Sequence, residues 1–130
     1  VFVGVTYTDP NLGTVVFRNN FPTGTVADDI QAYVIDDPDV IFQAQADGAV
    51  TQVDLGQNTN FAAVQATDTG DTTNGNSNTA VSSTTATTAT IAFRIVDFVD
   101  SPTSTVGDAF TDLLIKFNAG IHSYDNATGI

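Results

Sequence analysis

Apolar and polar residues alternate along several short stretches of this chain, with the period of two that strands have. The most apolar stretch is Ala89–Asp100, in which one face carries Ala89, Ile91, Phe93 and Ile95. Beyond Ile95 the alternation shifts by one residue, so that Val96 and Phe98 become the apolar positions. Such a shift exchanges the two faces of a strand. It predicts a β-bulge near Ile95–Val96, or, as the alternative, a strand buried on both faces.

The N-terminal part of the chain has the pattern of a hairpin. Val1–Thr8 alternates cleanly, and Asp9–Gly13 has the residues of a turn. Thr14–Arg18 then reads as the returning strand. A further short apolar stretch at Gln31–Ile35 predicts another strand.

A second hairpin is predicted around Asp47-Gly48. Val40–Ala46 alternates, with Gln43 and Gln45 on the outward face. Asp-Gly favours a two-residue type I′ turn, because glycine adopts positive φ without strain. That turn would pair three sets of residues: Ala46 with Ala49, Ala44 with Thr51, and Phe42 with Val53.

The rest of the chain alternates between loops and short β-prone stretches. Phe61–Ala66 is a short strand or a helical turn, and Ala109–Ala119 a final strand. Thr79–Thr90 is rich in threonine, serine and alanine, and is also β-prone. Two polar regions are expected to be turn or loop: Leu55–Asn60 and Thr67–Asn78. About eight to ten short strands with little helix predict an all-β fold, a small antiparallel barrel or sandwich with long polar loops. We expect residues 1–130 to form a single β domain.

The composition supports an all-β fold and limits the kinds of partner that the protein can bind. All fifteen acidic residues are Asp, and Lys and Arg together number three. Asp, Asn, Gly and Thr favour turns and strands, whereas Glu and Lys favour helix. A net charge of −12 opposes binding to nucleic acid and to anionic membranes, since both require clustered basic residues. We therefore expect neither partner, and no apolar run is long enough to cross a membrane.

Candidate chemistry is sparse. The chain has no Cys and a single His, His122, whose neighbour Ser123 has the wrong geometry for a catalytic pair. Asp36, Asp37 and Asp39 surround Pro38; this cluster predicts a turn capped by carboxylates, with a calcium loop or a glycosidase carboxylate pair as the alternatives. We expect no enzyme activity, no catalytic residue, no metal site and no cofactor.

Aromatic and edge-strand residues are the better candidates for function. Phe21-Pro22 and Tyr124 lie in polar, irregular segments, where they either pack on a rim of the barrel or anchor a protein–protein contact. We expect Val1–Thr8 to be an edge strand, which could pair with a partner chain or with a segment that precedes Val1. The predicted partner interface comprises Val1, Phe2, Val3, Phe21, Pro22, His122 and Tyr124.

Several segments spread over the chain resemble a family of virion structural proteins of tailed phages, especially marine and cyanobacterial bacteriophages. The matching segments are Val1–Pro10, Ala32–Gly48, Arg94–Asp100, Val106–Asp112 and Ala119–Ile130. Members of that family carry a further segment before the first of these. The resemblance therefore implies that residues precede Val1.

The resemblance implies a capsid decoration, or cement, protein on the outer surface of the virion. Its partners would be the major capsid protein and two further copies of itself in a homotrimer. The fold would be a small barrel like the β-tulip of phage head decoration proteins. The alternative is a virion adhesion or fibre-associated module that binds carbohydrate or calcium through its Asp- and Asn-rich loops.

Overall fold

The computed structural model describes residues 1–62, 70, 71 and 73–118. Over these residues the fold is all-β, with two antiparallel sheets and one short 3₁₀ helix, η1. The elements are β1 (Phe2–Asp9), β2 (Thr14–Arg18), β3 (Gln31–Val34), β4 (Ile41–Gln45), η1 (Gln52–Asp54), β5 (Asn58–Thr59), β6 (Phe93–Phe98) and β7 (Asp112–Phe117). The described part of the chain contains no helix that is long and apolar enough to span a membrane.

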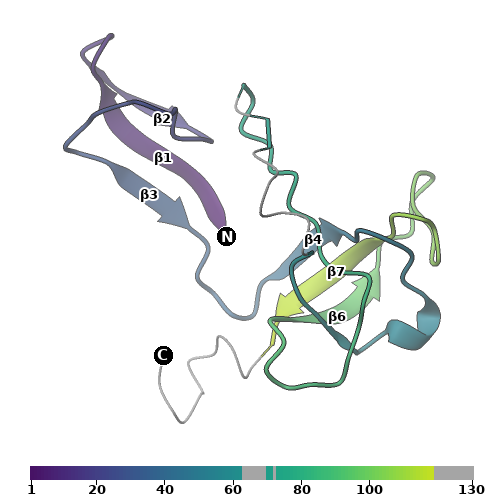
Figure 1. Cartoon of the computed structure of the whole chain (residues 1–130). Coiled ribbons are helices and arrows are strands. Elements are labelled where there is room, and N and C mark those ends of the chain that lie inside the picture. Colours follow the sequence, from purple (N-terminus) through teal and green to yellow (C-terminus); the bar gives the residue numbers. More distant parts are fainter. Residues whose placement is uncertain (63–69, 72, 119–130) are drawn as a thin grey trace. The chain divides into compact units, whose positions relative to one another are not determined.

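The chain divides into two compact units. One comprises Val1–Asp36 and Thr69–Asn78, and the other Asp37–Asp68 and Thr79–Ile130. Each unit holds one sheet, with the order β2-β1-β3 in the first and β4-β7-β6-β5 in the second (Figure 1). Neither sheet closes into a barrel over the described residues. That the whole chain forms a single domain stays a prediction.

The predicted N-terminal hairpin is confirmed. Strands β1 and β2 pair antiparallel, from Val5 opposite Arg18 to Asp9 opposite Thr14. The turn between them closes with a 2.8 Å hydrogen bond from the Gly13 N–H to the Asp9 carbonyl, and Gly13 has a φ of 66°. On one face of β1 the side chains of Val5 and Tyr7 are buried, at 2% and 1% exposed.

The predicted strand at Gln31–Ile35 is confirmed as β3, which lies on the other side of β1. Its register with β1 shifts between Phe2 and Gly4, so Val3 is an extra residue on the β1 side. The N-terminal ammonium of Val1 donates to the Ile35 carbonyl at 2.9 Å, and the Ile35 N–H donates back to the Val1 carbonyl at 2.7 Å. β3 is therefore held along its full length on its inner side.

The second unit contains the hydrophobic core. Its buried members come from β6, β7 and the segments outside the strands: Ala46, Val50, Val81, Phe93, Ile95, Leu113 and Ile115. β7 is central, with β4 on one side and β6 on the other. Phe42 lies opposite Ile115 and Ala44 opposite Leu113, so the predicted inward face of Val40–Ala46 is confirmed.

The predicted β-bulge is also confirmed. In the β6–β7 pair the register shifts between Ile95 and Asp97: Ile95 lies opposite Ile115, and Asp97 opposite Leu114. The extra residue is Val96, which is 40% exposed, whereas Ile95 is fully buried. The alternative of a strand buried on both faces is therefore wrong.

The hairpin predicted at Asp47-Gly48 is wrong. Ala46 forms a parallel bridge with Val81, and the Asp47 N–H donates to the Val81 carbonyl at 2.9 Å. Val53, the expected partner of Phe42, lies in η1 and is 80% exposed. The physical reason is that β7 offers Phe42 and Ala44 a larger apolar surface than Thr51 and Val53 could, which outweighs a local turn preference.

The first turn of η1 also opposes that hairpin. The carboxylate of Asp54 accepts hydrogen bonds from the backbone N–H and the side-chain hydroxyl of Thr51, both at 2.9 Å. The Asp54 N–H donates in turn to the Thr51 carbonyl at 2.9 Å, so these bonds stabilise the first turn of η1. They remove Thr51 from any pairing with Ala44.

The region between η1 and β6 differs from the sequence expectation. Asn58–Thr59, expected to be turn, is strand β5, and both residues are buried, at 2% and 0% exposed. Phe61 forms an isolated bridge with Val81, and Thr79–Thr90 contributes bridges rather than a continuous strand. The remainder of the predicted Phe61–Ala66 strand lies mostly outside the described residues.

Candidate partner-binding surface

The predicted interface residues at the N-terminus are exposed. Val1, Phe2 and Val3 have 54%, 46% and 48% of their surfaces exposed, although all are apolar. Phe2 lies opposite Val34 of β3, which is 60% exposed. This end of the first sheet therefore presents apolar side chains that its own unit leaves uncovered.

Phe21 and Pro22 have a packing role in the first unit. The ring of Phe21 meets that of buried Tyr7 edge to face, with centroids 5.1 Å apart. Pro22 is half-buried, and its carbonyl accepts a hydrogen bond from the Thr25 N–H at 3.2 Å. Phe21 is still 38% exposed, so it covers Tyr7 and also reaches solvent. The other two predicted interface residues, His122 and Tyr124, lie outside the described residues.

A second group of exposed apolar side chains, not predicted from the sequence, lies on the face of the first sheet opposite Val5 and Tyr7. Val15, Phe17 and Tyr33 are 69%, 61% and 47% exposed. The rings of Phe17 and Tyr33 lie with their centroids 6.1 Å apart. The available signal was the run Val15-Val16-Phe17, which leaves apolar residues on both faces of β2.

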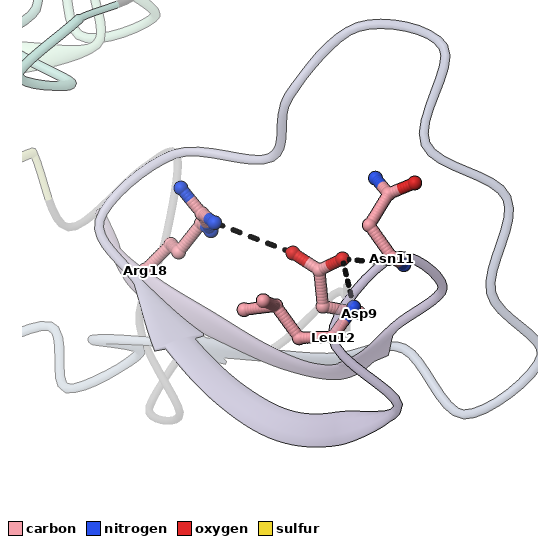
Figure 2. Close-up of polar contacts among 4 residues, drawn as sticks. All are labelled: Asp9, Asn11, Leu12 and Arg18. Carbon is pink, nitrogen blue, oxygen red and sulfur yellow. Dashed lines mark hydrogen bonds and ion pairs between the residues drawn. The ribbon is translucent and has the colours of Figure 1, made fainter.

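Asp9 fixes the geometry of the hairpin that carries this surface (Figure 2). Its carboxylate accepts hydrogen bonds from the Asn11 N–H at 2.9 Å and the Leu12 N–H at 3.3 Å, and pairs with Arg18 Nη2 at 3.3 Å. The hydrogen bond from Asn11 is the largest influence, and together these contacts hold the pKa of Asp9 below its ordinary value. Asp9 is 7% exposed, so its carboxylate has a structural role in the hairpin.

Asp29 performs a similar role on the other side of β1. Its carboxylate accepts the Thr8 N–H, at 2.9 Å to Oδ1, and the Thr8 hydroxyl, at 2.7 Å to Oδ2. These bonds lower the pKa of Asp29, and the hydrogen bond from the Thr8 N–H has the larger effect. A side chain therefore continues the hydrogen bonding of β1 beyond the start of β3.

The Asp cluster around Pro38 is a capped turn. The Asp37 Oδ1 accepts the Asp39 N–H at 2.8 Å, and Asp39 pairs with Lys116 Nζ at 2.6 Å. This agrees with the capped turn expected from the sequence. In the polar loop the Asp71 carboxylate likewise accepts the Thr73 N–H at 2.8 Å. Over the described ranges, no three His, Cys, Asp or Glu residues gather as metal ligands would.

All three basic side chains contact groups within the chain. Arg18 pairs with Asp9, Lys116 pairs with Asp39, and Arg94 Nε donates to the Asn58 Oδ1 at 3.3 Å. With fifteen acidic residues, the charge left facing solvent is strongly negative. A partner that is attracted by charge must therefore supply basic groups.

Comparison of this chain with protein-family models, with curated proteins and with solved structures finds no match.

Proposed function

We propose that this protein is a capsid decoration, or cement, protein that binds the outer surface of a phage head and stabilises the lattice of the major capsid protein. The observation that carries the proposal is the uncovered apolar surface of the first sheet, at Val1, Phe2, Val3 and Val34. Apolar side chains grouped on a surface are typical of sites that meet another protein. The resemblance of five segments to phage virion proteins suggests that this partner is the major capsid protein.

The charge of the molecule supports the same proposal. The basic side chains are engaged within the chain, and the acidic ones outnumber them fivefold. Such a surface repels nucleic acid and anionic membranes, so we propose neither as a partner. On the outside of a virion it would keep neighbouring particles apart through like-charge repulsion.

The proposal also covers the number of copies that assemble and the way in which the sheets combine. We propose that the protein acts as a homotrimer, and that its sheets complete a barrel or sandwich of the β-tulip kind. A trimer places three copies of each apolar surface on one particle, so modest individual contacts add up through avidity. Sedimentation equilibrium of the purified chain would measure the number of copies.

The mechanism would be preferential binding to the expanded lattice. A ligand that binds only one state stabilises that state by RT ln(1 + [L]/Kd), which is about 2.7 kcal/mol at a hundredfold excess over Kd. Such a protein needs rigid strands and complementary surfaces, and its contribution would accumulate over every site on the head.

The test is co-sedimentation of labelled protein with phage heads that lack it. We expect saturable binding, with heads that afterwards resist heat better than undecorated heads. The matched control is the double variant Phe2→Ser, Val3→Ser, which removes apolar surface without touching the core and should bind less. Binding to tails or host cells in place of heads would overturn the proposal and favour an adhesion module.

A further inference from the structure

Strand β3 forms an open edge of the first sheet. Among the residues that the structure describes, its one strand partner is β1, and all four of its residues, Gln31–Val34, are exposed. Figure 1 shows it as the outer strand of its sheet. An edge strand carries a row of N–H and C=O groups that can pair with another chain.

The hydrogen bonds of the neighbouring residues show which groups face outward. The Thr8 N–H points to the β3 side, since it donates to Asp29, and Ile35 exchanges both backbone bonds with Val1. In an antiparallel strand alternate residues bond to the same neighbour. Gln31, Tyr33 and Ile35 therefore face β1, and the N–H and C=O groups of Ala32 and Val34 point away from the sheet.

The side chains of β3 do not block this edge. Natural edge strands are protected by shortness, by charged side chains such as Lys, by Pro or by a bulge. β3 is short, with four residues, but Gln31–Val34 contains no charged residue and no Pro. The bulge in this sheet is on β1, at Val3. An added strand would find the Tyr33 and Phe17 rings on one face and the exposed Val34 on the other.

The charges at the two ends of β3 determine which kind of strand can pair with its free edge. Asp28 and Asp29 precede β3, and Asp36 and Asp37 follow it. In a second copy paired through Ala32 and Val34, antiparallel register would set the Asp28–Asp29 end of one chain beside the Asp36–Asp37 end of the other. Like charges placed opposite each other destabilise a strand pair, whereas basic residues at the same positions stabilise it.

We propose that the open edge of β3 binds an extended segment of a partner protein, with a β-prone centre and basic residues at both ends. The added strand pairs with the backbone of Ala32 and Val34. This inference rests on the proposed function in one respect, since it names how the capsid protein is held. Its chemistry, strand addition with charge complementarity, can be tested without capsids.

The direct test uses the full chain and a short synthetic peptide, with alternating valine and threonine in its centre and paired lysines at each end. Nuclear magnetic resonance should show that the amides of Ala32 and Val34 shift on titration and exchange with solvent at least about tenfold more slowly when the peptide is bound. A peptide N-methylated on its pairing edge, and one with paired aspartates at its ends, should have neither effect. Equal shifts with all three peptides, or no change at β3, would overturn the inference.

The matched variant is Ala32→Pro, which removes an outward N–H and no bond to β1. We expect peptide affinity to fall at least about tenfold while the melting temperature stays near that of the unaltered chain. Val34→Pro provides the same test if the first variant misfolds. A folded proline variant at either position that binds the peptide as well as the unaltered chain contradicts the proposal.

The same variants separate this inference from the proposed function. If the unaltered chain and Ala32→Pro bind phage heads equally, capsid binding stands and the edge is not the attachment site. If the chain binds the peptide but not heads, the edge is a binding site and the capsid function fails.

Discussion

The ring of Phe17 lies directly over Gly4, so that a Cβ atom added at Gly4 would come within 2.3 Å of the ring. The two residues lie on adjacent strands, because Phe17 is opposite Thr6 in the β1–β2 register. The absence of a side chain at Gly4 therefore allows the far end of an exposed aromatic ring to approach the backbone of β1. The same ring contacts Tyr33 on the far side of β1.

This relationship predicts that Gly4→Ala and Phe17→Ala are coupled. Alone, Gly4→Ala displaces the ring and crowds the Arg18 carbonyl, 3.0 Å from the added atom, at a cost of about 1 kcal/mol. With Phe17 already replaced by alanine the main clash is gone, so the same change should cost less or stabilise the strand. A double-mutant cycle by urea unfolding measures the coupling free energy, expected to be about 0.5–1 kcal/mol. Simple additivity of the two changes would show that the ring does not rest on Gly4.

The bulge in β6 predicts opposite outcomes for two adjacent residues. Ile95 is fully buried in the core, so Ile95→Ala should lower the free energy of unfolding by about 2–5 kcal/mol. Val96→Ala, at a position 40% exposed, should cost less than about 1 kcal/mol. Chemical denaturation of both variants is the measurement. Similar losses at the two positions would mean that Val96 is buried and that the register continues without a bulge.

Removing the Thr111 hydroxyl should lower the stability of the fold, because the buried Val50 N–H would lose its acceptor. Its hydroxyl oxygen accepts the Val50 N–H at 3.0 Å and its proton goes to the Asp108 carbonyl at 2.9 Å, and Thr111 and Val50 are fully buried. Thr111→Val keeps the shape and removes the acceptor, which should cost about 1–3 kcal/mol. Thr111→Ser keeps the hydroxyl and should cost less, since it loses only a methyl group. Thermal unfolding of the pair checks this, and a valine variant as stable as the serine variant would contradict it.

Asp29 predicts a stability difference that depends on pH. Its folded pKa lies below the ordinary 3.8, so the unfolded chain binds its proton first as the pH falls. The stabilisation is therefore fully present well above pH 3.8 and is lost as the pH falls through the folded pKa. Asp29→Asn should be less stable than the unaltered chain at pH 7, and the two should converge in acid. A difference that stays constant from neutral to acid pH would show that the carboxylate charge contributes nothing.

Local patterns predicted those elements whose pairing is local or whose alternation is strong. The hairpin of β1 and β2, the inward face of β4, strand β7 and the bulge near Ile95 all followed from residues close in sequence. The error at Asp47-Gly48 arose because Ala46 pairs with Val81, 35 positions away, and no local signal reports that contact. Strand β5 was missed because its two residues are polar, and their burial depends on distant acceptors such as the Thr88 and Ser82 carbonyls.

The candidate surface was predicted only in part. Val1, Phe2 and Val3 were identified as part of an edge strand, which is wrong, because β1 is the central strand of its sheet and pairs with both β2 and β3. Their side chains are nevertheless exposed. Phe17 and Tyr33 were missed because alternation alone does not tell which of two apolar faces is covered. The open edge of β3 depends on strand order, which the sequence of a short four-residue strand does not determine.

The engagement of Arg18, Arg94 and Lys116 within the chain has a consequence for molecules crowded on one surface. Each copy brings a cloud of dissolved cations, and its Lys and Arg side chains are already engaged within the chain. Copies held side by side must share that cloud, and its osmotic pressure rises as the surrounding salt is diluted. Dilution will therefore push neighbouring copies apart, so that a dense layer of this protein packs more closely at high salt than at low salt.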